Sequence, residues 1–139
     1  MTKSLIIYII DDDDIYQFTA MRIIETHQLA KKTFVFSDGE MAIKYLINNV
    51  GNKDNLPDII FLDINMPIMD GWQFLEEYKL LKPKIEKKIQ IYLVSSSLNK
   101  IDLNRAKDIS EISDYIIKPV KSEKLIELIE DLEKKTGNI

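Results

Sequence analysis

Short apolar runs alternate along this chain with longer segments of helical spacing, and no other feature of the sequence constrains the fold as much. The first run, from Ser4 to Ile10, is almost continuously apolar and ends at four consecutive aspartates. A strand that is apolar at successive positions is buried on both faces, which is typical of a parallel sheet covered by helices. We therefore expect an α/β fold in which helices connect parallel strands.

Five strands and five helices are predicted from these patterns. The strands are expected at residues 4–10, 33–36, 59–62, 90–94 and 115–117, and the helices at 15–28, 41–47, 72–81, 99–109 and from Ser122 onward. Ser37-Asp38 is a candidate cap for the second helix. The charged segment 82–88 is expected to be an exposed loop. The apolar positions with helical spacing in the first helix are Phe18, Met21 (or Arg22), Ile24 and Leu29.

Composition narrows the class of protein. A chain of 139 residues with 45% hydrophobic residues can bury one full core, so we expect a single domain over residues 1–139 with no output domain. The net charge of −4 and the pI near 5.1 argue against a nucleic-acid partner. The chain lacks cysteine, a signal peptide and any apolar stretch near the roughly 20 residues that span a membrane. A soluble cytoplasmic protein without a membrane partner is expected.

Polar residues directly follow four of the predicted strands. Asp11-Asp12 follow the first strand, Asp63 the third, Ser95 the fourth and Lys118-Pro119 the fifth. Because open α/β sheets place their chemistry at the carboxyl ends of their strands, these side chains are expected to meet at one edge. Together they indicate a site for a phosphate group and a metal ion.

The motifs around these residues resemble those of the receiver domain of two-component response regulators. They read Ile9-Ile10-Asp11-Asp12, Leu62-Asp63-Ile64-Asn65-Met66-Pro67-Ile68-Met69-Asp70-Gly71, Val94-Ser95-Ser96 and Tyr115-Ile116-Ile117-Lys118-Pro119. The resemblance covers roughly residues 4–133 and is to the small stand-alone form typified by the chemotaxis response protein. It implies a doubly wound, flavodoxin-like sheet of five parallel strands in the order 2-1-3-4-5, with five helices.

The resemblance also implies a chemical role for the carboxylates. Asp63 would be the phosphoacceptor, forming an acyl phosphate with a phosphoryl group from a histidine kinase or a histidine phosphotransfer protein. Asp11, Asp12, Asp63 and the backbone carbonyl of Asn65 would bind Mg²⁺ as the cofactor. The cation would also reduce the repulsion among the three carboxylates.

Lys118 and Ser95 would act on the phosphoryl group. By family position, Lys118 pairs first with Asp63 and then with the phosphoryl oxygens, and Ser95 donates a hydrogen bond to one of those oxygens. Tyr115 would turn inward as Ser95 moves, which would change the surface formed by the fourth helix, the fifth strand and the last helix. That surface would bind a downstream protein that the sequence does not identify. The resemblance further implies a cis peptide bond between Lys118 and Pro119.

Two assignments stay open. The metal-binding pair could be Asp12-Asp13, although the family pattern places the pair directly after the strand. The hydroxyl group could come from Ser96 or Ser97, although Ser95 fits the family position best.

Several other polar residues have structural explanations. Asp13 and Asp14 are expected in the loop and first turn of a helix, where the helix dipole favours negative charge. Asp70-Gly71 are expected to form a turn and a helix entry, and His27 is expected at the surface or in packing. By family position, Asn65 and Ser97 would govern how long the acyl phosphate lasts.

The sequence thus favours a phosphorylated signalling switch rather than an enzyme with a substrate of its own. A haloacid-dehalogenase-type phosphatase also uses an aspartate nucleophile and Mg²⁺. That class expects a second aspartate where this chain has Asn65, and it carries its nucleophile on the first strand. The remaining alternative is a receiver-like binding module that is not phosphorylated. Loss of the acidic pair, the acceptor or the lysine would favour that module, and none of these is missing.

Overall fold

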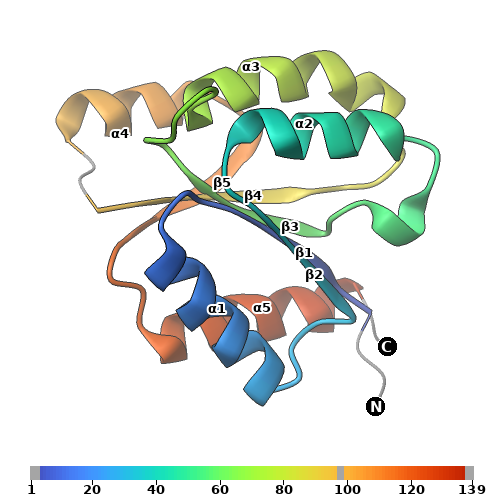
Figure 1. The fold of residues 1–139 in the computed structure, drawn as a ribbon, viewed down its shortest axis with the longest axis vertical. Helices are drawn as coiled ribbons and strands as arrows, with labels where there is room; N and C mark the ends of the chain where they lie inside the picture. The colour runs from blue at the N-terminus through green and yellow to red at the C-terminus, as the bar shows by residue number, and fades with distance from the viewer. Residues whose placement is uncertain (1–3, 97–98, 137–139) are drawn as a thin grey trace.

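The computed structural model describes residues 4–96 and 99–136 and contains one sheet of five parallel strands (Figure 1). The strands are β1 (Ile6–Ile10), β2 (Lys32–Phe36), β3 (Ile59–Asp63), β4 (Gln90–Ser95) and β5 (Ile112–Ile117). They lie in the order β2-β1-β3-β4-β5, and every pairing is parallel. The predicted fold class and strand order are therefore confirmed.

Helices connect the strands and cover both faces of the sheet. They are α1 (Asp14–Thr26), α2 (Gly39–Asn48), α3 (Gly71–Leu81), α4 (Lys100–Lys107) and α5 (Ser122–Thr136), with short 3-10 turns at Lys53–Asn55 and Lys82–Lys84. Figure 1 shows α1 and α5 on one face of the sheet and α2, α3 and α4 on the other. Within the described ranges, no helix has both the length and the apolar composition needed to cross a membrane.

Strand β1, which lies between β2 and β3, contributes to two separate hydrophobic layers. Ile6, Tyr8 and Ile10 belong to the core that contains residues of α2, α3 and α4. Ile7 and Ile9 belong to the core that contains residues of α1 and α5. All five residues are buried, and burial of such a side chain contributes about 1.5–3 kcal/mol. Successive residues of β1 thus meet different apolar layers, which is why the run is apolar at every position.

Side chains that accept backbone N–H groups begin four of the helices. Asp13 caps α1, Asp38 caps α2, Asp70 caps α3 and Asn99 caps α4. At α3, the Gln73 side chain also accepts the backbone N–H of Asp70, which completes a capping box. The predicted cap at Asp38 and the predicted helix entry at Asp70 are confirmed.

The predicted inward face of α1 is partly wrong. Ile24 and Leu29 are buried as predicted, but Phe18 is 65% exposed. Tyr16, Ala20 and Ile24 form the buried stripe instead. This stripe also has a four-residue spacing, but two of its residues are the polar aromatic Tyr16 and the small Ala20. The larger apolar side chain of Phe18 therefore gave the stronger sequence signal and predicted the wrong face.

The segment 82–88 is also more structured than predicted. It opens with the 3-10 turn at Lys82–Lys84, and the following Ile85 is buried in the core. Lys87 then forms an ion pair with Asp58, with 3.3 Å between Nζ and Oδ2. One apolar residue in a charged segment was enough to anchor it.

The contact between α4 and α3 depends on few side chains. Ala106 is the one buried residue of α4, which agrees with the weak apolar pattern of this helix. The guanidinium carbon of Arg105 lies 4.5 Å from the centroid of the Trp72 ring at the start of α3. Such a cation–π contact contributes about 0.5–2 kcal/mol. A helix with so little buried surface can shift at small cost.

Gly71 brings the start of α3 into direct contact with the end of β3. The backbone N–H of Gly71 donates to the carbonyl of Ile64, with 2.8 Å between N and O. A Cβ atom at this position would lie 2.5 Å from the carbonyl oxygen of Asp63 and 2.9 Å from the Cα of Ile64. Both atoms belong to the backbone, so neither can turn away as a side chain could. The loop after β3 therefore depends on a residue without a side chain.

We expect Gly71→Ala to lower the free energy of unfolding by about 1–3 kcal/mol, because the added methyl group overlaps backbone atoms. Gly51→Ala is the matched control, since no heavy atom lies within 4 Å of a Cβ there, and its effect should stay within about 0.5 kcal/mol. Urea unfolding followed by circular dichroism measures both values. Equal stability of the two variants would contradict the close contact at Gly71.

Candidate functional site

Three carboxylates meet at the carboxyl edge of the sheet. Asp11 directly follows β1 and Asp63 ends β3, and these strands are neighbours in which Ile10 pairs with Leu62. One oxygen each from Asp11, Asp12 and Asp63 lies within 4.8 Å of the others. Asp11 is fully buried, Asp63 is 6% exposed, and Asp12 is exposed. The cluster is thus mostly buried but reaches solvent at Asp12.

The backbone around Asp11 is fixed by neighbouring elements. The N–H of Asp11 donates to the carbonyl of Phe36 at the end of β2, with 2.9 Å between N and O. The carbonyl of Asp11 accepts a hydrogen bond from the side-chain amide of Gln17 in α1. Its Oδ1 atom accepts the N–H of Asp13 at 2.9 Å. These contacts hold the carboxylate against the end of the sheet.

Asp13 has a different position from the two aspartates before it. Its Oδ1 atom accepts the backbone N–H groups of Ile15 and Tyr16, at 3.0 and 3.3 Å, and so caps α1. The structure therefore groups Asp11 and Asp12 with Asp63, whereas Asp13 begins the helix.

Lys118 lies beside this cluster. Its Nζ atom is 2.8 Å from Oδ2 of Asp11 and 3.7 Å from Oδ2 of Asp13. These are its ion pairs within residues 4–96 and 99–136, so the pairing with Asp63 that the resemblance implies is not the arrangement in this structure. The reason is the fully buried Asp11 carboxylate, which has the greater need of a counter-ion. The Lys118–Pro119 peptide bond is cis, as in the geometry that the resemblance implies.

The remaining predicted residues surround the same edge. Ser95 ends β4, is buried, and accepts the backbone N–H of Lys118 on its carbonyl at 2.9 Å. Ser96 is exposed, and Ser97 lies outside the described residues. Asn65 is an exposed residue of the loop after β3. Tyr115, on β5, is 40% exposed.

Burial and repulsion change the protonation of the carboxylates. Burial, together with the Asp11 carboxylate, raises the pKa of Asp63 to about 7, although Lys118 acts in the opposite direction. Burial also raises the pKa of Asp11, against the effect of the neighbouring Lys118 ammonium group. For Lys118, burial lowers the pKa, but Asp11, Asp63 and Asp13 outweigh it and raise the pKa overall. One ammonium group therefore faces several carboxylates, which leaves the cluster short of positive charge.

The cluster has the chemistry of a divalent-cation site. Its donors are hard carboxylate oxygens from Asp11, Asp12 and Asp63, the kind of ligand that Mg²⁺ prefers. A cation there would supply the missing positive charge and favour the ionised form of Asp63. The residues present thus fit such an ion.

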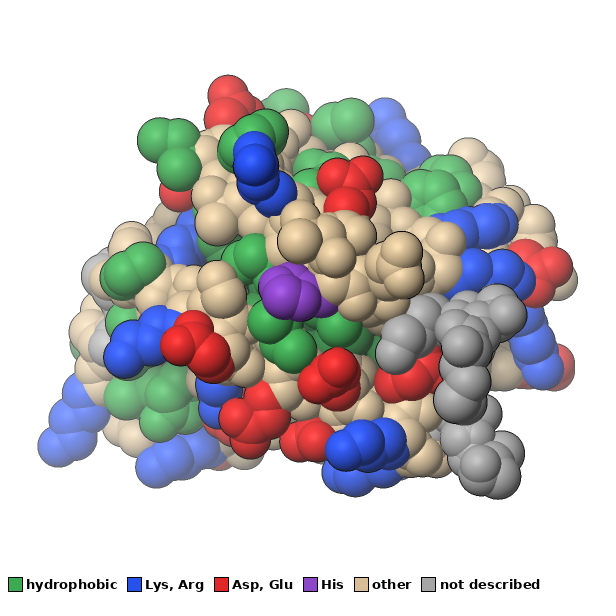
Figure 2. All heavy atoms as spheres, turned by 90° about the horizontal axis from the view of Figure 1, so that it is seen from below, with side chains coloured by type: hydrophobic (Ala, Val, Ile, Leu, Met, Phe, Trp, Pro, Cys, Tyr) green, Lys and Arg blue, Asp and Glu red, His purple; other side chains and the backbone are tan. Residues whose placement is uncertain are grey.

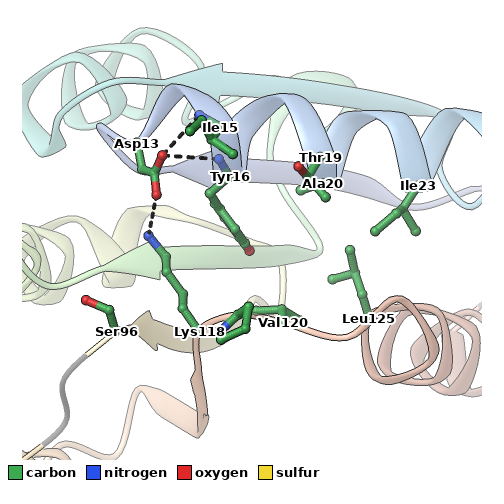
Figure 3. Close-up of a pocket in the computed structure, with 11 residues that line it drawn as sticks. Asp13, Ile15, Tyr16, Thr19, Ala20, Ile23, Ser96, Lys118, Val120 and Leu125 are labelled. Atoms are coloured by element: carbon green, nitrogen blue, oxygen red, sulfur yellow. Dashed lines mark hydrogen bonds and ion pairs between the residues drawn. The ribbon is translucent and has the colours of Figure 1, made fainter.

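A cavity of about 360 Å³ opens next to Lys118, between α1 and the loop that leads to α5 (Figure 3). Its walls include Tyr16, Ala20 and Ile23 from α1, together with Val120 and Leu125. The Tyr16 ring lies beside the ammonium group, with 4.7 Å between Nζ and the ring centroid. The lining is mostly apolar, and its polar residues are Thr19 of α1 and, near the carboxylate cluster, Asp13, Ser96 and Lys118.

Sequence reasoning missed two residues of this region, Tyr16 and Gln17. The spacing of Tyr16 with Ala20 and Ile24 was a usable signal for a buried position. No sequence signal indicated that the Gln17 amide would reach the carbonyl of Asp11. That contact depends on how α1 lies against the sheet.

His27 takes no part in the carboxylate cluster. It follows the last turn of α1, about 20 Å along the helix from Asp13. Figure 2 shows the one histidine of the chain exposed on the face that α1 and α5 cover, among small groups of hydrophobic and acidic side chains. The predicted surface position is confirmed.

Comparisons with known proteins agree on one family. A family model described as the response regulator receiver domain matches residues 7–130. A solved two-component response regulator from Cytophaga hutchinsonii is 30% identical, with a TM-score of 0.75, over 94% of this chain and 98% of that one. The family-model match includes strands β2 to β5, all of β1 except Ile6, and the three residues of the carboxylate cluster.

Two curated relatives extend this result. The probable methanogenesis regulatory protein FilR2 of Methanothrix harundinacea is 27% identical over 127 residues, which are 91% of this chain and 80% of that protein. The sensor histidine kinase CheAY of Helicobacter pylori is 36% identical over 78 residues, which are 56% of this chain and 9% of the kinase. The similarity to the kinase thus concerns a small part of a much longer protein.

We expect Asp63→Asn to stabilise the protein at pH 8 in the presence of a chelator. The pKa of Asp63 rises from 3.8 to about 7 on folding, so between these values the folded chain binds more protons than the unfolded chain. The contribution of this residue to stability therefore becomes less favourable as the pH rises through that range. Removing the charge should raise the free energy of unfolding by about 1 kcal/mol or more at pH 8 and by less at pH 5. Urea unfolding at both pH values measures the difference.

Glu130→Gln serves as the control, because this side chain is exposed on α5 and its substitution should have no such pH dependence. If Asp63→Asn changed the free energy of unfolding equally at pH 5 and pH 8, the pKa of Asp63 would not be raised in the folded protein.

Proposed function

We propose that this chain, which belongs to the response regulator receiver domain family, accepts a phosphoryl group on Asp63 and signals through the resulting change of its surface. The observation that carries the proposal is the buried Asp63 carboxylate at the carboxyl edge of the sheet, with two further carboxylates and the Lys118 ammonium around it. Family membership rests on the match over residues 7–130. The reaction at this site is our inference.

In the proposed reaction, an oxygen of Asp63 attacks phosphorus. With phosphohistidine as donor, the P–N bond breaks, the new P–O bond to Asp63 forms, and the imidazole nitrogen takes the bonding pair. Such a transfer needs alignment and neutralisation of the phosphoryl oxygens more than covalent help. The backbone contacts around Asp11 and Gly71 would supply the alignment, because they fix the ends of β1 and β3.

Two side chains would stabilise the phosphoryl oxygens. The ammonium group of Lys118 lies against Asp11, so a small movement would bring it to a phosphoryl group on Asp63. Ser95 ends the neighbouring strand, from which its hydroxyl would donate a hydrogen bond. Charge-assisted hydrogen bonds of this kind are about twice as strong as neutral ones.

Mg²⁺ would be held by Asp11, Asp12, Asp63 and the Asn65 carbonyl, and it would neutralise charge on the acceptor and the phosphoryl oxygens. The phosphodonor would be a histidine kinase or a histidine phosphotransfer protein. The similarity to the sensor histidine kinase CheAY supports a place in this kind of signalling pathway. Asn65, next to the acceptor, would also influence how water reaches the acyl phosphate.

We expect incubation with acetyl phosphate and Mg²⁺ to add one phosphoryl group to the protein, as measured by intact-protein mass spectrometry. Excess chelator should abolish the adduct, because the carboxylates would then repel the incoming anion. Asp63→Asn should abolish it under all conditions, whereas Asp70→Asn, at the cap of α3, should leave it in place.

An adduct that persisted in Asp63→Asn would assign the phosphoryl group to another residue. The absence of any adduct on the wild-type protein, together with no Mg²⁺ binding, would favour the alternative of a receiver-like binding module that is not phosphorylated.

The output surface would be formed by α4, β5 and α5. Tyr115 and Ile117 of β5 and Ile101 of α4 are large side chains that are well exposed in this region. The single buried residue of α4, Ala106, would let this helix move as Ser95 approaches the phosphoryl group and Tyr115 turns inward. Contacts that differ between two packings shift the population of the two states. An unidentified protein would bind one state in preference to the other.

We expect the ring resonances of Tyr115 to shift on phosphorylation, because the half-exposed ring would enter a buried environment. Selective tyrosine labelling and NMR spectra, recorded before and after addition of acetyl phosphate and Mg²⁺, measure the change. Tyr45 of α2 is the internal control, since it is also partly buried but lies in the aromatic cluster with Phe34 and Phe36. If a phosphorylated wild-type protein showed no shift at Tyr115, this residue would have no part in the switch.

A further inference from the structure

We propose that Tyr16 is a positioning residue for Lys118, and that its ring face acts together with the Asp13 carboxylate to hold the ammonium group at the carboxylate cluster. The effect that we assign to this contact in phosphoryl transfer rests on the proposed function. The contact itself does not.

Three groups on the α1 side surround the Lys118 ammonium. The Oδ2 atom of Asp11 lies at 2.8 Å, the Oδ2 atom of Asp13 at 3.7 Å, and the centroid of the Tyr16 ring at 4.7 Å from Nζ. In Figure 3, Lys118 extends from the loop after β5 toward Asp13, and the Tyr16 side chain descends from α1 beside it. A ring face at this distance attracts a cation, and the attraction is larger where water is excluded.

The ring also narrows the space into which the Lys118 side chain could turn, because both residues line the same cavity. The cavity beside it has a volume of about 360 Å³, and Tyr16 is one of its walls. A lysine side chain has four rotatable bonds, so an ammonium group without this wall could turn into the cavity and be hydrated there. The carboxylates of Asp11 and Asp13 attract Lys118, and the Tyr16 ring adds a third contact at the edge of the cavity.

The tyrosine hydroxyl is not what the position requires. It is buried and finds no hydrogen-bond partner in the part of the chain that the structure describes. Burial, with the carboxylates of Asp11 and Asp63, raises the pKa of Tyr16, so the ring remains neutral. Phenylalanine would offer the same ring face without the buried hydroxyl. Because that hydroxyl has no hydrogen-bond partner among the described residues, removing it would not weaken the fold.

Asp13 connects the same ammonium group to α1. One of its oxygens caps the helix by accepting the N–H groups of Ile15 and Tyr16, and the other pairs with Lys118. The first turn of α1 therefore carries both the ring and the second carboxylate that surround Lys118. The position of the lysine is thereby linked to the helix that covers this face of the sheet.

The first test is a spectroscopic one that does not depend on activity. Protons above an aromatic ring resonate upfield, so the Hε resonances of Lys118 should be shifted upfield in the wild-type protein and in Tyr16→Phe. The shift should disappear in Tyr16→Leu and in Tyr16→Met, because neither side chain has a ring. Methionine is the longer of the two and fills more of the space that the tyrosine occupies. Lys118→Met identifies the resonance by its loss. Retention of the shift in both variants without a ring would overturn the proposal, as would its loss in Tyr16→Phe.

The second test measures the rate of phosphorylation by acetyl phosphate and Mg²⁺. We expect Tyr16→Leu and Tyr16→Met to lower this rate by about threefold to tenfold, and Tyr16→Phe to leave it unchanged. In a Lys118→Met background, removal of the ring should have no further effect, because Tyr16 acts through the lysine. An equal loss of rate in both backgrounds would show a general structural role and contradict the proposal.

Tyr78→Leu is the matched control, because Tyr78 is also a buried tyrosine but lies on α3, in the other hydrophobic layer. It should change neither the Lys118 resonance nor the rate beyond its effect on stability. If the wild-type protein formed no adduct at all, the proposed function would fail, while the resonance would still decide whether Tyr16 positions Lys118.

Discussion

The repulsion among buried carboxylates at the end of β1 and β3 is the constraint on which the rest of the structure depends. Asp11 and Asp63 are both almost without exposure to solvent, and among the described residues the ammonium group of Lys118 is the one that forms an ion pair with either of them. Such an arrangement is unfavourable unless the backbone around it is well supported. Two hydrogen bonds support the backbone of Asp11: its N–H donates to the carbonyl of Phe36, and its carbonyl accepts the side-chain amide of Gln17. The close packing at Gly71 supports the end of β3. The repulsion between these carboxylates lowers the stability of the fold locally, but it also creates a site that attracts a cation.

The same constraint explains why Lys118 connects distant parts of the chain. Its backbone is bound to Ser95 at the end of β4, and its side chain reaches Asp11 after β1 and Asp13 at the start of α1. A phosphoryl group on Asp63 would compete with these partners for the ammonium group. Movement of the Lys118 side chain would then change the contacts of α1 on one face of the sheet and those of β4 and β5 at its edge. This is a physical basis for a switch in a rigid α/β fold.

Much of the fold and of the candidate site could be predicted from the sequence. Continuous apolar runs identified the buried strands, and the position of Asp11, Asp63 and Lys118 directly after such runs placed them at one edge of the sheet. The inward face of α1 could not be obtained in the same way, because Tyr16 and Phe18 suggest different stripes. The partner of Lys118 could not be predicted either. That choice depends on distances between side chains from separate elements, and these follow from packing rather than from local pattern.

The most direct test of this account is a crystal structure of the protein grown with Mg²⁺ and beryllium fluoride, which mimics a phosphoryl group on a carboxylate. The account predicts the fluoride adduct on Asp63, a metal ion bound to Asp11, Asp12 and Asp63, and the Lys118 ammonium moved from Asp11 to the adduct. A structure in which neither the metal nor the adduct binds at this cluster, under conditions that saturate both, would contradict it.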